Sequence, residues 1–315
     1  MKKVYLAAAA TSALALAATP VMADEHQSMS VYGWITAEVQ EKGGVWDAGA
    51  KNGGNSESRF GIRGSREFGA VTGDAQLEYG ILRGNDENSP GLRLANAALS
   101  GDFGSVRIGQ QWNPGYLWTT ATTDVFTSGA ASGARSTDFV FREDGGIFYY
   151  TPSLGGLEVA IGGSMLTSKE NSKDFDTMTV SARYSLGDLY LSATYMEADD
   201  GNSSKSTAFA ASYDFGMFTL AGAIADNDGA VQPGSEFNDD GTPYEIAATF
   251  SATEELTLKV AYTDRDLEAG DDTSMAVEAA YAFGSGVTGF VGFSSSDDNI
   301  NEGDDILSFG VQVVF

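Results

Sequence analysis

Residues that could carry out covalent chemistry are scarce in this sequence of 315 residues. It contains no cysteine, which excludes a thiol nucleophile and cysteine-based metal sites, and its single histidine is His26. Hydrolytic enzymes usually need a nucleophile beside a base, and the chain has no Gly-x-Ser-x-Gly motif. We therefore do not expect an enzyme. The charged side chains must act without forming covalent bonds.

Arginines are the charged residues with the most informative spacing. Arg59 and Arg63 alternate with apolar residues in Arg-Phe-Gly-Ile-Arg, and Arg107 does so in Val-Arg-Ile. In an extended strand, this alternation places the guanidinium groups on one face and the apolar side chains on the other. A row of arginines facing water orients anions and dipoles at little desolvation cost.

Period-two alternation recurs along most of the chain. In the last segment, Leu307, Phe309 and Val311 alternate with small or polar residues. Such segments are strands with one apolar and one polar face. We predict sixteen of them, at 29–39, 58–67, 71–82, 91–100, 105–111, 146–151, 157–166, 176–186, 189–197, 206–215, 217–225, 243–251, 256–264, 273–283, 287–294 and 306–315.

These strands could form a soluble β-sandwich or a transmembrane barrel. Most are about nine to eleven residues long, which is the length a tilted strand needs to cross a bilayer. Their polar faces carry charges at mid-strand, tight turns alternate with long loops, and Tyr and Phe gather at strand ends. We predict an all-β fold, a 16-stranded antiparallel transmembrane β-barrel, which is wide enough to enclose an aqueous channel.

The interval 112–146 departs from this repeat. It is rich in Thr, Ala, Gly and Ser, and a structureless insertion of this length in a compact domain usually has a function. We expect it to fold inward and to set the width of the bore. Trp112, Tyr116 and Trp118 either line an aromatic path for a sugar-like solute or anchor the root of this loop.

The first 23 residues have the pattern of a secretory signal peptide. Lys2 and Lys3 precede an Ala-rich apolar core, and Val-Met-Ala at 21–23 offers a cleavage site. We expect the mature chain to comprise residues 24–315. Its net charge is two units more negative than the −26 of the whole chain, because the signal carries two lysines and no acid. So large an excess argues against nucleic acid as a partner and favours attraction of cations.

Five segments resemble the Gram-negative general porins. They are Ser-Val-Tyr-Gly-Trp at 30–34, Ser-Arg-Phe-Gly-Ile-Arg-Gly-Ser at 58–65, Leu-Ser-Gly-Asp-Phe-Gly-Ser at 99–105, Ile-Phe-Tyr-Tyr-Thr-Pro at 147–152 and Gly-Val-Gln-Val-Val-Phe at 310–315. The resemblance runs through the whole mature chain. It implies a homotrimer in the cell outer membrane, in contact with outer-membrane lipid and lipopolysaccharide, whose third extracellular loop folds into the pore.

In such porins, acids on the loop face a basic cluster on the wall at the narrowest point. The resemblance places Arg93 inward, beside Arg59, Arg63 and Arg107 on the polar faces. The candidate constriction residues are therefore the basic wall Arg59, Arg63, Arg93 and Arg107 and the loop acids Asp124 and Asp138. A simpler alternative is that the arginines pair with lumen acids such as Glu78 and only stiffen the wall. The family's acidic turn is replaced here by Ser-Gly-Ala-Ala-Ser-Gly-Ala at 128–134, and Gly109 is followed by Gln110 where many porins have arginine.

Two further features complete the sequence hypothesis. The terminal Phe315 matches the family's signal for the barrel assembly machinery, and it can also serve as one more lipid-facing aromatic residue. The outer loops are acidic, so we expect weak calcium binding at most and no other cofactor, or simply a solvated rim that attracts cations. The function that we predict is passive diffusion of small hydrophilic solutes and ions, with cations preferred. The alternatives are a channel specific for a sugar or organic ion, and a barrel with an adhesin or structural role.

Overall fold

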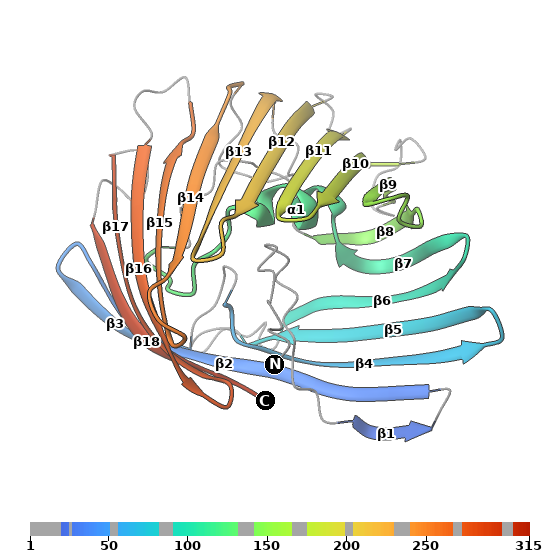
Figure 1. Cartoon of the computed structure of the whole chain (residues 1–315), viewed down its shortest axis with the longest axis horizontal. Helices are drawn as coiled ribbons and strands as arrows, with labels where there is room; N and C mark the ends of the chain where they lie inside the picture. The colour runs from blue at the N-terminus through green and yellow to red at the C-terminus, as the bar shows by residue number, and fades with distance from the viewer. Residues whose placement is uncertain are drawn as a thin grey trace.

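The structure, a computed structural model, describes residues 20–24, 27–50, 56–81, 91–131, 142–165, 175–198, 204–229, 240–266, 273–297 and 305–315. Sixteen antiparallel strands form a closed barrel, in which each strand pairs with its neighbour in sequence and the last strand pairs with the first (Figure 1). The barrel strands are β2 (Gln27–Lys42), β4 (Arg59–Phe68), β5 (Val71–Gly80), β6 (Gly91–Gly101), β7 (Gly104–Trp112), β8 (Arg142–Tyr150), β9 (Leu157–Ser164), β10 (Thr177–Leu186), β11 (Leu189–Ala198), β12 (Ser204–Asp214), β13 (Phe218–Asp228), β14 (Tyr244–Ser251), β15 (Leu256–Asp264), β16 (Thr273–Gly284), β17 (Val287–Ser296) and β18 (Ile306–Val314).

The predicted sixteen-stranded barrel is confirmed, and each predicted segment overlaps one barrel strand. Two additional strands occur. β1 (Pro20–Asp24) pairs with the start of β2 and includes the end of the predicted signal peptide, while residues 1–19 lie outside the described part of the chain. β3 (Val45–Ala50) pairs with the C-terminal part of β2, residues 37–42. β4 pairs with the N-terminal part of β2, residues 27–34.

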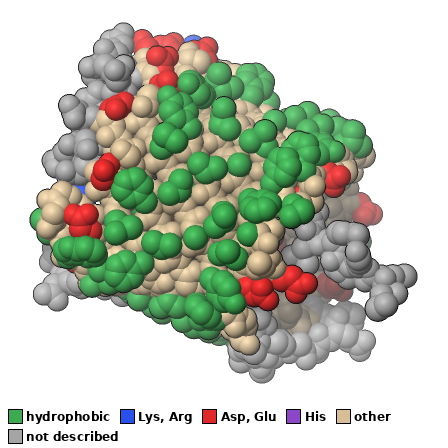
Figure 2. All heavy atoms as spheres, turned by 60° about the vertical axis from the view of Figure 1, so that its left-hand side comes forward, with side chains coloured by type: hydrophobic (Ala, Val, Ile, Leu, Met, Phe, Trp, Pro, Cys, Tyr) green, Lys and Arg blue, Asp and Glu red, His purple; other side chains and the backbone are tan. Residues whose placement is uncertain are grey.

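The apolar faces of the strands point away from the barrel axis. In β16, Met275 and Val277 are 56% and 45% exposed, whereas Ala276 and Glu278 between them are 1% and 3% exposed. Figure 2 shows hydrophobic side chains spread over the outer face of the strands, with acidic side chains towards its edges. This inside-out distribution is what a strand between hydrocarbon and a polar interior requires.

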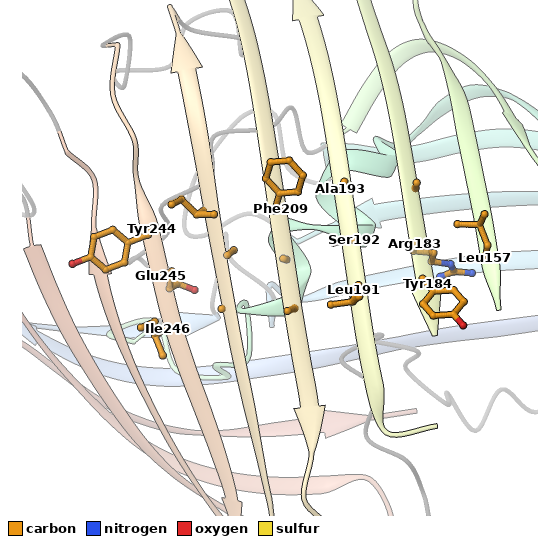
Figure 3. A pocket seen from close by; sticks show the side chains of 16 residues that line it. Leu157, Arg183, Tyr184, Leu191, Ser192, Ala193, Phe209, Tyr244, Glu245 and Ile246 are labelled. Carbon is orange, nitrogen blue, oxygen red and sulfur yellow. The ribbon is translucent and has the colours of Figure 1, made fainter. Parts of the chain in front are cut away.

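The outer face also carries a shallow hollow of about 660 Å³ across β10 to β14 (Figure 3). Small residues, including Ala193 and Gly222, leave room there between bulky neighbours such as Leu191, Phe209 and Ile246. The hollow therefore belongs mainly to the apolar outer surface.

Residues 113–131, which follow β7, lie inside the barrel (Figure 1). This segment begins with a short helix, α1 (Pro114–Trp118), which packs against β10 and β11. A 3₁₀ turn at Thr120–Thr122 follows, against β12 and β13. None of the helices in the described part of the chain is long and apolar enough to cross a membrane.

Candidate functional site

Two of the four predicted wall arginines form a buried cluster with two glutamates. Arg93 donates from Nε to Glu78 Oε1 at 2.8 Å and pairs through Nη1 with Glu57. Arg59 Nη1 lies 3.7 Å from the same Glu78 oxygen, and its Nε donates to the Glu57 carbonyl at 2.9 Å. Within this group of four, two guanidinium groups are matched by two carboxylates.

Aromatic rings support the same arginines. The Arg59 guanidinium lies 4.4 Å from the ring centre of Trp34, and that of Arg93 lies 5.6 Å from Trp112. Arg142 covers the Trp112 ring as well, at 5.2 Å. Planar guanidinium groups suit this combination of stacking and paired hydrogen bonds better than lysine would. Arg59 and Arg93 are only 5% and 3% exposed as a result.

A β-bulge explains how Arg93 reaches the interior. Glu78 of β5 is paired with Leu94 and Tyr79 with Leu92, so Arg93 is the extra residue of β6. Strict alternation would place only one of Arg93 and Leu94 inside, yet both are buried. A bulge re-aims a side chain in this way, and here it brings Arg93 onto the two glutamates.

The other two predicted wall arginines are more accessible. Arg63 is exposed, with its Nε 3.3 Å from Ser30 Oγ. Arg107 is half-buried and donates to Asp74 at 2.6 Å and to Asn96 at 2.5 Å. The sequence alternative, in which wall arginines pair with lumen acids, therefore matches the pairing of Arg59, Arg93 and Arg107, while no described acid pairs with Arg63.

The root of the inner loop is fixed by a buried polar network. Asn113 caps α1 by accepting from the Gly115 amide at 2.6 Å, which satisfies one of the free N–H groups at the start of the helix. The Asn113 side-chain amide donates to Glu143 of β8 and to Thr179 of β10, at 2.8 and 2.9 Å. These contacts join the loop to two strands that lie on either side of β9.

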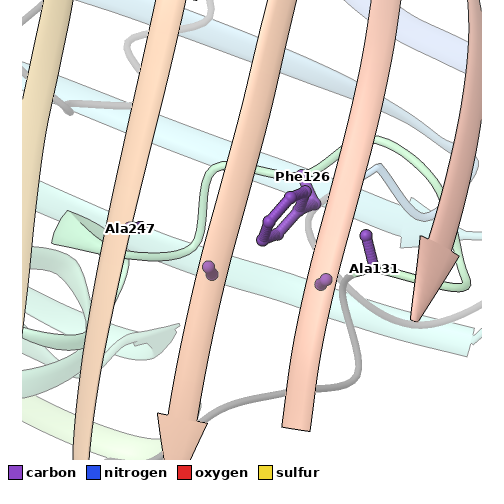
Figure 4. Packing of buried hydrophobic residues seen from close by; sticks show 5 residues of the cluster. Phe126, Ala131 and Ala247 are labelled. Atoms are coloured by element: carbon purple, nitrogen blue, oxygen red, sulfur yellow. The ribbon is translucent and has the colours of Figure 1, made fainter. Parts of the chain in front are cut away.

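The middle of the loop inserts one aromatic side chain into the wall. Phe126 is 3% exposed and packs against Ala247, Ala261 and Ala276 (Figure 4). These alanines face each other in register on β14, β15 and β16. Three small residues in a cross-strand row leave a socket that a phenyl ring can fill, so the anchor is apolar although the wall around it is polar.

The tip of the loop is held by carboxylates of the wall. Glu278 accepts hydrogen bonds from the Thr127 and Ser128 amides at 2.8 and 2.6 Å and from Lys259 at 2.7 Å. Glu38 of β2 accepts from the Gly129 amide at 2.9 Å. Hydrogen bonds to an ionised carboxylate are roughly twice as strong as neutral ones. The segment 113–131 thus crosses the interior, attached to β8 at Asn113 and to β2 at Gly129.

The loop acids and aromatic residues are engaged within the loop. Asp124 is 8% exposed and accepts from Tyr116 Oη at 2.8 Å, and Asp138 lies outside the described residues. Trp112 and Tyr116 stack at 4.9 Å, and Trp118 is 4% exposed beneath Arg183. Buried rings of this kind suit the anchoring role that the sequence offered as an alternative to an aromatic path.

The predicted loop bounds differ slightly from the strand ends. β7 includes Trp112 and β8 begins at Arg142, so the interval between the strands is 113–141, of which 113–131 is described. Most acidic residues of the outer loops also lie outside the described ranges. Within those ranges no group of three His, Cys, Asp or Glu could hold a metal ion.

Several of these site residues escaped the sequence analysis. Alternation places Lys259 and Glu278 on the polar faces of their strands. Their contacts with Thr127 and Ser128, more than 100 residues away in the sequence, leave no local signal. Phe126 looked like one more apolar residue in a loop. By contrast, the Asn-Pro pair at 113–114 is a recognisable helix start, because Asn caps well and Pro is favoured in the first turn.

Comparison with known proteins decides the family. A family model described as Gram-negative porin matches residues 7–301. This chain belongs to the Gram-negative porin family. This porin is accordingly an outer-membrane β-barrel channel, and its relatives are channels, not enzymes.

Curated relatives of this porin include outer membrane porin protein 32 of Delftia acidovorans, 26% identical over 67% of this chain and 67% of the relative. A monosaccharide porin of a Halomonas species is 24% identical over 64% of this chain and 60% of the relative. Among solved structures, an anion-selective porin from Comamonas acidovorans has a TM-score of 0.74 and 21% identity, covering 92% of this chain and all of that one. OmpF of Salmonella typhi, solved in complex with daunomycin, also gives 0.74, with 17% identity over 93% and 99% of the two chains.

Proposed function

We propose that this porin is a passive diffusion channel for small hydrophilic solutes and ions that prefers cations. The supporting observation is the neutralisation of the wall arginines. Arg59 and Arg93 share Glu57 and Glu78, and Arg107 is paired with Asp74. The chain as a whole carries a net charge of −26. A strongly acidic protein raises the concentration of cations within a Debye length of its surface, roughly 8–10 Å.

We also propose that the loop 112–146 forms the constriction. The described part of this loop runs along the interior from Asn113 to Ala131 and is held at its root, middle and tip. A segment tied to the wall at three places is a fixed obstacle in the bore. In this proposal Arg59, Arg63, Arg93 and Arg107 form the basic wall of the constriction, and Asp124 and Asp138 are acids of the loop.

Three further expectations concern export, assembly and membrane partners. We propose that the chain is exported by its signal peptide and assembles as a homotrimer among outer-membrane lipids and lipopolysaccharide. We propose that Phe315 is read by the barrel assembly machinery. Its side chain is 52% exposed, and its backbone forms two hydrogen bonds with Gly33, at 3.0 and 3.1 Å. The terminal residue is thereby held at the junction of the last and first strands.

Planar bilayer recording tests the proposed function. The purified protein should insert ohmic channels in KCl, and under a salt gradient the reversal potential should have the sign of potassium preference. Chloride preference would refute the cation preference; the porin from Comamonas acidovorans is described as anion-selective. Membranes that stay sealed to ions, with correctly folded protein, would refute the channel itself.

A further inference from the structure

The charges of the lumen differ greatly in their access to water. Arg59 and Arg93 are 5% and 3% exposed. The side chains of Arg107 and Arg183, on the wall nearer the short turns, are each 26% exposed, and both are paired with a carboxylate at 2.6 to 2.7 Å. The described wall therefore presents one buried cluster of paired charges and two half-exposed ion pairs.

Arg63 is the exception among the described lumen arginines. Its side chain shares the inner face of β4 with Arg59, because Phe60 and Ile62 between them face outward and are 40% and 43% exposed. Arg63 itself is exposed, and no described carboxylate forms an ion pair with it.

The surroundings of Arg63 hold its guanidinium group in place without neutralising it. Its Nε lies 3.3 Å from Ser30 Oγ, and its Cζ lies over the Tyr32 ring at 5.5 Å from the ring centre. The Tyr32 hydroxyl is itself fixed, because it donates to Glu78 at 2.9 Å and accepts from Gln76 at 2.5 Å. The two Nη groups keep the fork geometry that binds a carboxylate or phosphate through two hydrogen bonds.

We propose that Arg63 is the residue that sets the permeability of anions in this channel, in place of the buried Arg59 and Arg93. This inference rests on the proposed channel function and deepens it. The acidic chain favours cations, and Arg63 provides the opposing positive charge in the bore. Small anions, with oxyanions foremost, have their strongest contact there.

The test compares charge variants of Arg63 in planar bilayers under a KCl gradient. A charge in the bore attracts or repels a passing ion even in water, and salt screens this interaction. We expect the ratio of potassium to chloride permeability to rise about threefold in Arg63→Gln and about tenfold in Arg63→Glu. Inorganic phosphate should slow the chloride current of the unmodified protein more than that of Arg63→Gln.

Arg66→Gln is the matched control. Arg66 is also an exposed arginine of β4, but it lies on the outer side, where its guanidinium is 5.5 Å from the Phe68 ring centre. Its loss should leave the permeability ratio unchanged. Folding of every variant is checked by heat-modifiable migration on gels, and Arg63→Gln serves alone if Arg63→Glu does not fold.

Two results would overturn the role of Arg63. One is a folded Arg63→Gln channel with the permeability ratio of the unmodified protein, and the other is an equal shift in Arg66→Gln. Either result leaves the diffusion channel intact. Absence of ion-conducting channels in the unmodified protein would instead overturn the proposed function, so the two failures are distinguishable.

Discussion

Replacing Phe126 with alanine should loosen the inner loop while leaving the barrel folded. The ring is 3% exposed and is enclosed by Ala247, Ala261 and Ala276. Burial of a phenylalanine side chain removes on the order of 150–200 Å² of apolar surface from water. At roughly 25 cal/mol per Å², this burial contributes about 4–5 kcal/mol of free energy. Large-to-small substitutions of buried phenylalanine cost a similar amount, about 3–5 kcal/mol.

The lost free energy should weaken the docking of the loop and not the barrel, because the strands behind the ring keep their own hydrogen bonds. A loss of about 3 kcal/mol lowers the ratio of docked to undocked loop about a hundredfold. Hydrogen bonds from the loop tip to Glu278 and Glu38 still oppose complete release. Single-channel recordings should therefore show greater open-channel noise and an altered mean conductance.

Two other variants sharpen this experiment. Ala261→Leu fills the socket from the wall side and should disturb the loop in the same way, since Ala261 is the central residue of the alanine row. Phe209→Ala removes an equal ring from the outer face, where Phe209 is 56% exposed, and should leave the recordings unchanged. Conductance and noise in Phe126→Ala identical to those of the unmodified protein would refute the assignment of Phe126 as a loop anchor.

Three further predictions concern other parts of the molecule. Arg93→Met removes the ion-pair partner of Glu57 and the nearer of the two guanidinium groups beside Glu78, and should cost about 3–5 kcal/mol, seen as a lower temperature for loss of the heat-modifiable band. Arg107→Met, at a half-exposed pair, should cost no more than about 1 kcal/mol, and equal losses would contradict the distinction. Glu278→Ala removes the acceptor for two loop amides and should raise channel noise; quiet channels would show that the tip needs no carboxylate. Deletion of Phe315 should reduce the yield of folded barrel in the outer membrane, and an undiminished yield of heat-modifiable protein would count against an assembly signal.

The number of strands and the direction in which their side chains point were predictable, because every barrel strand shows the same alternation. Hydrocarbon on one side and a polar interior on the other force alternation, so a segment such as 273–283 is recognisable as a strand with one apolar and one polar face. Where the pattern is disturbed, prediction was less accurate. β8 begins at Arg142, four residues before the expected start, because its Arg-Glu-Asp-Gly-Gly sequence looks like a loop although Glu143 is buried.

The strand β3 was missed, although a local signal was present. Gly43 and Gly44 both have positive φ angles, of 56° and 83°, and they link β2 to β3 by a two-residue turn. A Gly-Gly pair between extended segments is a typical hairpin sequence. The alternation after it is short, and Val45 and Trp46 are 70% and 58% exposed, so the amphipathic pattern is weak there.

The candidate site was the least predictable part, for a physical reason. Burial of Arg93 depends on a bulge, and its neutralisation depends on Glu57, which reaches it from before β4. Neither the bulge nor the partner follows from alternation, which specifies the face of a residue but not its contacts. The same limit applies to Phe126, whose socket is built from three separate strands.

The pairing of β18 with β2 has a consequence for how the molecule must form. Ile306 lies opposite Lys42 and Val314 opposite Trp34, so the seam joins residues some 270 positions apart. Until the C-terminal strand arrives, two unpaired strand edges would be left in hydrocarbon, where each unsatisfied peptide group costs several kcal/mol. Insertion of a partial barrel is therefore strongly disfavoured. Contacts between residues so far apart in the sequence also form slowly. Closure of the barrel is therefore a step at which assistance from cellular machinery would be useful.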